Sequence, residues 1–321
     1  MDIETRAASL TDETILAAPT FQRRRGQGLA LLVLAALLWG TVGVTAALLN
    51  RVQQTPALTV GFLRLAVSSP FLIGLAFVAT RRNPFRLRRH EWPLLALMGL
   101  AMAGYQLFYF TAIPLSSVTL VVVVALCSAP VIVALLSIPV FGERLTIQVI
   151  GALMLALAGT GLLAFGGKSA SGEFFKPEYL LGALLALGAG FSYSSFAILS
   201  KLTTRRHSDI TAPQAMAVAF TMGALILLPL AGVSGNLKLD LPGGVWLYAA
   251  YLGLVPTGVA YVIYMRVLRS VTATTATIIT LLEPAIAAGL ASLLLGETLS
   301  LNSLLGAVLL IGSVALLYSK R

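Results

Sequence analysis

The sequence contains very little charge for its length. Asp, Glu, Lys and Arg make up 11% of its 321 residues, and hydrophobic residues make up 58%, whereas soluble domains carry about 25% charged residues. This composition excludes an ordinary soluble domain and indicates a protein embedded in a lipid bilayer. Cysteine is scarcer still. The lone Cys127 excludes a disulfide within the chain and argues against a thiolate metal or redox centre.

Histidine is also scarce, and nucleotide-binding motifs are absent. His90 and His207 both lie in polar segments between apolar runs. No nucleophile–base set therefore lies within the membrane, and the sequence predicts a protein that is not an enzyme. The chain has no G-x-x-x-x-G-K-[ST] loop, so any transport would be secondary. We expect no cofactor and no metal site.

Ten apolar segments are long enough to cross a bilayer. A spanning helix needs about 20 apolar residues, and it satisfies its backbone hydrogen bonds internally. The sequence therefore predicts an all-α membrane protein of ten transmembrane helices, at about residues 27–49, 55–79, 92–113, 116–140, 146–166, 178–200, 211–233, 244–265, 271–294 and 301–318. Residues 1–26 mix acids with bases, which is unlike a signal peptide. We interpret them as a disordered cytoplasmic tail.

The basic residues predict the orientation of these helices. The net charge is +10, but the charges cluster in short loops, where they set topology rather than bind nucleic acid. With the N-terminus in the cytoplasm, 17 of the 22 Lys and Arg residues lie in cytoplasmic segments and 4 lie outside. The remaining one, Arg64, lies within a span. Both termini are therefore predicted to be cytoplasmic, in a multi-pass protein of the inner membrane.

The second half of the chain repeats the first at a shift of 154 positions. The shift superimposes several uncommon landmarks: Gly28 on Gly182, Trp92 on Trp246, Gly99 on Gly253, Gly104 on Gly258, Pro130 on Pro284, and Gly142-Glu143 on Gly296-Glu297. Each repeat, 27–166 and 178–319, holds five spans. Because five is odd, the second repeat enters the membrane from the opposite face. Such inverted repeats are typical of secondary transporters.

Several local strings resemble a known family. They are ATIITLLEPAIAA (276–288) running on to LLGE (294–297), FGERLT (141–146), LWG (38–40), GVAY (258–261) and YMRVL (264–268). The first resembles the second-repeat signature of the EamA-type exporters of the drug/metabolite transporter superfamily, and the second resembles their first-repeat signature. The resemblance implies a ten-helix carrier that moves small metabolites, often amino acids, out of the cytoplasm. One position departs from the repeat: Glu283-Pro284 in the second repeat aligns with Ala129-Pro130 in the first, so the acidic residue has no counterpart.

Two ionisable residues lie within predicted spans. A charge at the centre of a bilayer costs about 2.5–3.5 kcal/mol on insertion scales, so such residues mark functional sites or internal partners. Glu283 either binds a substrate amine or proton, or supports the helix break beside Pro284. Arg64 either contacts a substrate carboxylate, or forms a structural ion pair or snorkels. Neither has a charged counterpart in the other repeat.

Prolines and aromatic residues complete the candidate site. Pro130 and Pro284 lie mid-span at equivalent positions and are either hinges or packing kinks. Trp39 and its repeat mate Tyr193 are mid-span aromatic residues that either line a central cavity or pack internally. The remaining candidates are the tyrosines of the third and eighth spans, Tyr105, Tyr109 and Tyr261.

The two Gly-Glu pairs end the fourth and ninth spans. Glycine there suits a left-handed helix cap, and Glu143 and Glu297 are expected either to cap the following helix or to act as gates.

These observations predict a secondary transporter that exports amino acids or related small metabolites by alternating access. The alternatives are an importer or a drug or cation efflux carrier of the same fold and, from another class, a channel or membrane scaffold. The expected partners are a small-molecule substrate and the lipid bilayer, without nucleic acid. The sequence does not predict an oligomeric state.

Overall fold

The computed structural model describes the backbone of residues 3–165, 177–207, 209–233, 235, 237, 240–296 and 299–319. Side chains are described from residue 26 onward, except at 118, 119, 165 and 295. The elements are α1 Ile3–Val52, α2 Ala57–Thr80, α3 Trp92–Leu115, α4 Val118–Phe141, α5 Ile147–Phe165, α6 Pro177–Arg206, α7 Ala212–Val233, α8 Gly243–Leu252, the π-helix η2 Gly253–Val259, α9 Ala260–Val267, α10 Ala273–Thr280, α11 Glu283–Leu295 and α12 Leu301–Tyr318.

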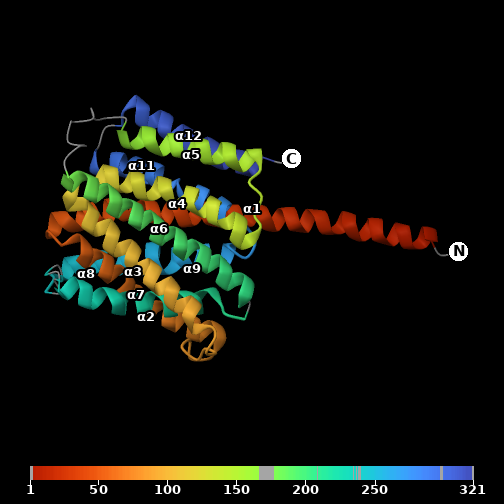
Figure 1. Cartoon of the computed structure of the whole chain (residues 1–321), viewed down its shortest axis with the longest axis horizontal. Helices are drawn as coiled ribbons and strands as arrows, with labels where there is room; N and C mark the ends of the chain where they lie inside the picture. The colour runs from red at the N-terminus through yellow and green to blue at the C-terminus, as the bar shows by residue number, and fades with distance from the viewer. Residues whose placement is uncertain are drawn as a thin grey trace.

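The described residues contain ten helical spans long and apolar enough to cross a membrane, as the sequence predicts. The eighth span consists of α8, η2 and α9, and the ninth of α10 and α11. The helices run side by side, and both chain termini leave the bundle at the same end (Figure 1). We call this the termini end. Successive spans alternate in direction, so the even-numbered spans finish at the termini end.

The first helix is longer than the sequence predicts. Its backbone is helical from Ile3, within the segment for which the sequence predicts disorder, and the part long and apolar enough to cross a membrane begins at Gly26. Figure 1 shows the first turns projecting away from the bundle. Nucleation is the costly step of helix formation. Because the first span already forms a helix, the preceding residues can extend it without a new nucleation step.

The two repeats contact each other in a symmetric way. A Cβ on Gly99 of α3 would lie 2.6 Å from the carbonyl oxygen of Ala219 on α7. A Cβ on its repeat mate, Gly253 of η2, would lie 2.7 Å from the Val67 side chain on α2. The third span thus packs on the seventh as the eighth packs on the second. Glycine at both positions lets two backbones approach closely, as at other helix interfaces in membranes.

The α5 and α12 helices pack closely along one edge of the bundle (Figure 1). Their closest approach is at Gly159 and Gly306. A Cβ on Gly306 would lie 2.6 Å from the Gly159 carbonyl oxygen and 2.8 Å from the Leu163 nitrogen. Backbone atoms cannot move aside as a flexible side chain can, so a larger residue here has to push the helices apart.

We expect Gly306→Val to destabilise the protein by about 1–3 kcal/mol, because overpacking a close helix contact costs this much. Gly312→Val on the same helix is the matched control, since a Cβ there meets no atom within 4 Å. The measurement is the apparent melting temperature of each purified variant in detergent. Equal melting temperatures for the two variants would contradict the role assigned to this contact.

Candidate substrate site

The ninth span is broken at its middle. Helix α10 ends at Thr280, Leu281 and Leu282 form a turn, and α11 begins at Glu283. Pro284 stands in the first turn of α11, where its missing N–H is not required. Glu283 also lies in this first turn, where the positive end of the helix dipole favours a carboxylate. The break therefore places an acidic side chain at mid-span.

Pro130, the repeat mate of Pro284, lies within an uninterrupted helix, α4. The two prolines, which the sequence predicts to be either hinges or packing kinks, thus stand in different local structures. Helix α6 packs along this part of α4, and the Ser194 hydroxyl donates a hydrogen bond to the Ala129 carbonyl at 3.0 Å. Such contacts hold the helix together across the proline, so only the ninth span is divided.

The eighth span contains a π-helix, Gly253–Val259, around Pro256. Single π-helical turns within α-helices are frequent at functional sites. The Thr257 hydroxyl donates to the Leu252 carbonyl at 2.7 Å and accepts from Arg64 Nε at 3.2 Å. Arg64 is 8% exposed, so it does not snorkel to the interface. Its partner in this contact is a hydroxyl from the other repeat.

Glu283 and Arg64 lie close enough to interact electrostatically. Both also interact with Tyr105 and Tyr109 of α3. Glu283 is half-buried, and among the described residues no hydrogen bond or ion pair is recorded for its carboxylate. The structure thus brings together two oppositely charged side chains that the sequence places 219 positions apart (283 − 64).

A layer of half-buried tyrosines lies beside this charged pair. The rings of Tyr105 and Tyr193 are 5.6 Å apart between centroids, and those of Tyr105 and Tyr109 are also 5.6 Å apart. These are ordinary separations for interacting aromatic rings. Glu283 interacts electrostatically with Tyr193 as well. The third, sixth and ninth spans therefore contribute to one polar, aromatic site.

Trp39 belongs to a second, more deeply buried aromatic layer. Its ring lies edge-on to Tyr261 at 4.9 Å and to Tyr264 at 5.7 Å. Trp39 and Tyr261 are each 4% exposed, so both belong to the packed interior and do not form an open wall. Trp39 Nε1 and the Tyr264 hydroxyl have no hydrogen-bond partner in the described part of the chain. Gly40 beside Trp39 allows α11 to approach, since a Cβ there would lie 2.5 Å from Ile286.

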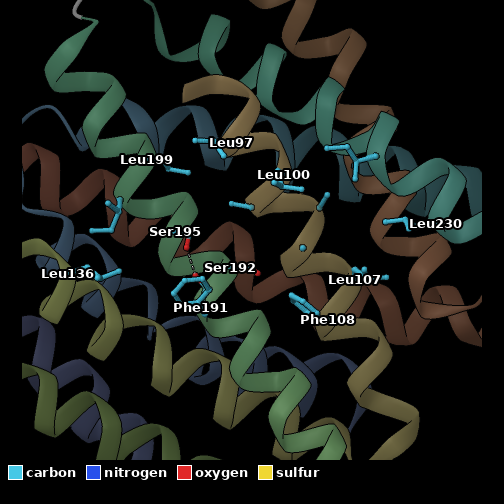
Figure 2. A pocket seen from close by; sticks show the side chains of 15 residues that line it. Leu97, Leu100, Leu107, Phe108, Leu136, Phe191, Ser192, Ser195, Leu199 and Leu230 are labelled. Carbon is cyan, nitrogen blue, oxygen red and sulfur yellow. Dashed lines mark hydrogen bonds between the residues drawn. The ribbon is translucent and has the colours of Figure 1, made fainter. Parts of the chain in front are cut away.

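A different cavity lies on the outer surface of the bundle. It has a volume of about 570 Å³ and lies between α3, α6 and α7 (Figure 2). Its lining is almost entirely apolar, and Leu97, Leu100 and Phe191 are each about half exposed. None of the predicted site residues lines it. This groove is separate from the charged site.

Glu143 connects the two repeats at the termini end. The helix α4 ends at Gly142 with a φ of 67°, the left-handed cap that the sequence predicts. The Glu143 carboxylate then accepts hydrogen bonds from the Ala273 nitrogen at 2.9 Å and the Thr274 hydroxyl at 2.9 Å. It caps α10 of the second repeat and not the next helix along the chain. Gly296 has the matching φ of 74°, and Glu297 lies outside the described residues.

Lys201 holds the other side of the same α9–α10 turn. This α6 residue is 9% exposed, and its ammonium group donates to the carbonyls of Leu268 at 2.5 Å and Val271 at 2.6 Å. The Glu143 carboxylate therefore satisfies backbone donors at the start of α10, and the Lys201 ammonium group satisfies the backbone acceptors just before it. We call Glu143 and Lys201, with the α9–α10 turn, the clamp. The charge pattern of the sequence places Lys201 among the loop charges and does not predict this role.

A further contact joins the ends of α4 and α6. The Arg205 guanidinium donates to the Phe141 carbonyl at 3.3 Å and lies 5.5 Å from the centre of the Phe141 ring. Polar side chains from the ends of the fourth and sixth spans thus meet the α9–α10 turn or its neighbours at the termini end. The contacts of Glu143 and Arg205 join the two repeats at that end of the bundle.

Ten spanning helices in two repeats, with a mid-span polar site, define a multi-pass membrane transport protein. The chain belongs to the EamA-like transporter family, whose sequence profile matches residues 26–165 and 180–319. It is a multi-pass transporter of the inner membrane, as predicted.

Relatives support this family and its fold. The uncharacterized transporter YwfM of Bacillus subtilis is 31% identical over 87% of this chain and 89% of its own length. The aromatic amino acid exporter YddG of Ancylobacter novellus is 26% identical over 71% of this chain and 74% of its own. A solved crystal structure with 21% identity has a TM-score of 0.78 and covers 91% of this chain and 96% of its own.

Proposed function

We propose that this protein exports amino acids or related small metabolites by alternating access. The observation that carries the proposal is the pair Glu283 and Arg64, which lies beside half-buried tyrosines at the break in the ninth span. An α-amino acid carries an ammonium and a carboxylate group. The first complements Glu283 and the second complements Arg64. The similarity to an aromatic amino acid exporter supports the same substrate class.

The tyrosines favour a substrate with a flat or apolar side chain. Tyr105 and Tyr193 present half-buried rings to the space beside Glu283, and aromatic pairs contribute about 0.5–1.5 kcal/mol beyond their buried area. Trp39 and Tyr261 pack against each other in the more deeply buried aromatic layer. The site would therefore bind the ammonium and carboxylate groups of the substrate at one side, and the substrate side chain would stack on the tyrosine rings at the other.

The clamp gives this site access to one side of the membrane at a time. With Glu143 and Lys201 holding the α9–α10 turn, the termini end is closed, and substrate would exchange with the opposite end. Release of these contacts would open the termini end. We place that end in the cytoplasm because most Lys and Arg residues lie there. Export then consists of loading with the clamp open and release with the clamp closed.

Counterflow in proteoliposomes tests the proposal. Purified protein is reconstituted with a high internal concentration of one unlabelled amino acid, and uptake of the same labelled compound is followed. We expect saturable, transient accumulation, strongest for aromatic amino acids and absent for nucleosides and cationic drugs. Accumulation driven by a cationic drug instead would support the efflux alternative. Flux that rises linearly with concentration would indicate a channel and overturn the carrier mechanism. Net efflux from loaded cells distinguishes export from import.

A further inference from the structure

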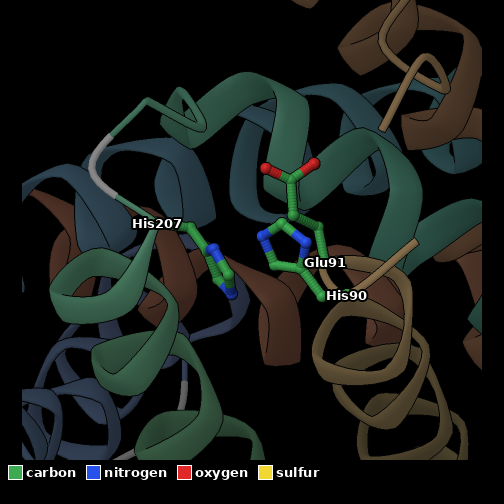
Figure 3. Close-up of side chains that lie close together, drawn as sticks. All are labelled: His90, Glu91 and His207. Carbon is green, nitrogen blue, oxygen red and sulfur yellow. The ribbon is translucent and has the colours of Figure 1, made fainter. Parts of the chain in front are cut away.

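His90, Glu91 and His207 lie together at the termini end, away from the charged site (Figure 3). Their ligand atoms all lie within 4.8 Å of one another, and the two imidazole rings are 5.5 Å apart between centroids. His90 and Glu91 immediately precede α3, whereas His207 follows α6. The sequence predicts no metal site, because these residues belong to separate loops. Packing of α3 on α6 brings those loops together.

Glu91 is a buried carboxylate with few partners. It is 3% exposed, and its Oε2 accepts one hydrogen bond from the Arg88 nitrogen at 2.6 Å. Among the described residues, the one ion pair recorded at this site joins Arg88 instead to Asp209, at 3.9 Å. Buried carboxylates are normally paired with cations or coordinate metals. The backbone hydrogen bond resembles the outer contacts that orient metal-binding carboxylates.

Two imidazoles and one carboxylate form a recognised donor set for zinc. Tetrahedral Zn²⁺ holds nitrogen and oxygen ligands at about 2.0–2.2 Å, which places neighbouring ligand atoms about 3.3 Å apart. His90 is exposed and His207 is half-buried, so both rings have room to turn, and metal binding requires the ligand atoms to close from within 4.8 Å to that spacing. Water would occupy a fourth position. The nitrogen ligands favour Zn²⁺ and its neighbours in the first transition row over Mg²⁺ and Ca²⁺.

We propose that His90, Glu91 and His207 bind a zinc-class divalent cation that links the start of α3 to the end of α6. The two helices belong to different repeats and pack against each other in the bundle. The bound ion would fasten the repeats together at the termini end. Binding itself does not depend on the proposed substrate or on the direction of transport, so it is measured without a transport assay.

The test uses the full chain, purified without a polyhistidine tag and stripped of metal. Co²⁺ is titrated in, its visible absorption is recorded, and Zn²⁺ is then added as a competitor. We expect one Co²⁺ per chain, displaced by Zn²⁺, and a rise in melting temperature when either ion binds. His207→Ala should weaken Co²⁺ binding at least 10-fold and remove the rise in melting temperature.

Two further variants separate loss of a ligand from loss of structure. His207→Gln preserves a polar side chain and should lose Co²⁺ binding as His207→Ala does, with an unchanged melting temperature in the absence of metal. Gln214 and Glu91 line the same polar pocket at the termini end. Gln214→Ala therefore changes the surroundings of Glu91 without removing a proposed ligand, and this variant should bind Co²⁺ normally. The proposal is overturned if the parent protein takes up no stoichiometric Co²⁺, or if both His207 variants bind it as tightly as the parent.

Discussion

Glu283→Gln is expected to reduce amino acid counterflow by about 10- to 100-fold. The substitution preserves the size of the side chain but removes its charge, and a hydrogen bond to a charged group contributes about 1.5–3 kcal/mol. Glu283 has no recorded hydrogen bond or ion pair in the described part of the chain and stands half-buried beside the tyrosines. Its charge is therefore available to a substrate ammonium group, and losing it should affect binding more than folding.

The measurements are the initial counterflow rate and its concentration dependence, at equal amounts of reconstituted protein. Glu178→Gln is the matched control, because Glu178 is exposed in the first turn of α6 and lies at the opposite end from the clamp. Glu283→Asp should retain part of the activity, since it keeps the charge at a shorter reach. Normal counterflow by Glu283→Gln would remove this residue from the site and favour its role in supporting the break at Pro284.

Glu143→Ala is expected to open the termini end. The variant removes the carboxylate that accepts from Ala273 and Thr274, and hydrogen bonds to a charged group contribute about 1.5–3 kcal/mol each. Since about 1.4 kcal/mol changes a two-state equilibrium 10-fold, the population open at this end should rise by about 10-fold or more. Lys201 would still hold the carbonyls on the other side of the turn.

Cysteine labelling measures this shift. With the lone Cys127 replaced by Ser, a reporter cysteine is introduced as Ala276→Cys in α10, at a position that is fully buried. Its reaction with a membrane-impermeant thiol reagent, added from the termini end, should be about 10-fold faster in Glu143→Ala than in the parent. Arg144→Gln is the control, because that neighbouring charge is exposed. Equal labelling rates in the parent and in Glu143→Ala would show that this contact does not hold the end closed.

The ten spans could be predicted closely from the sequence, because crossing a bilayer is a local requirement on length and polarity. The sixth span is the clearest departure: it is predicted at 178–200 and extends to Arg206. Its last turns carry Lys201 and Arg205, which hydropathy assigns to a loop. Both are instead accommodated by carbonyls of neighbouring elements. A hydropathy scale cannot anticipate partners that only packing supplies.

The candidate site was predictable in part. Glu283 and Arg64 stand out because charge within an apolar span is costly, and Trp39 stands out by its mid-span position. Nothing in the sequence distinguishes Thr257 from the other threonines of the spans, although the adjacent Pro256 marks a disturbed helix. The sequence also treats Pro130 and Pro284 as equivalent. The structure divides only the ninth span, since contacts around α4 maintain that helix through its proline.

The abundance of apolar residues and the scarcity of charge are sufficient to define a membrane protein of ten helices in two inverted repeats. These properties follow from periodicity, length and charge, which are local in the chain. Tertiary structure alone selects the partners of the few polar side chains. Glu143 caps α10 instead of the helix that follows it, and His207 meets His90 and Glu91 across the two repeats. Such pairings depend on how the repeats pack, because in an apolar bundle each polar group bonds whatever partner the packing brings within reach.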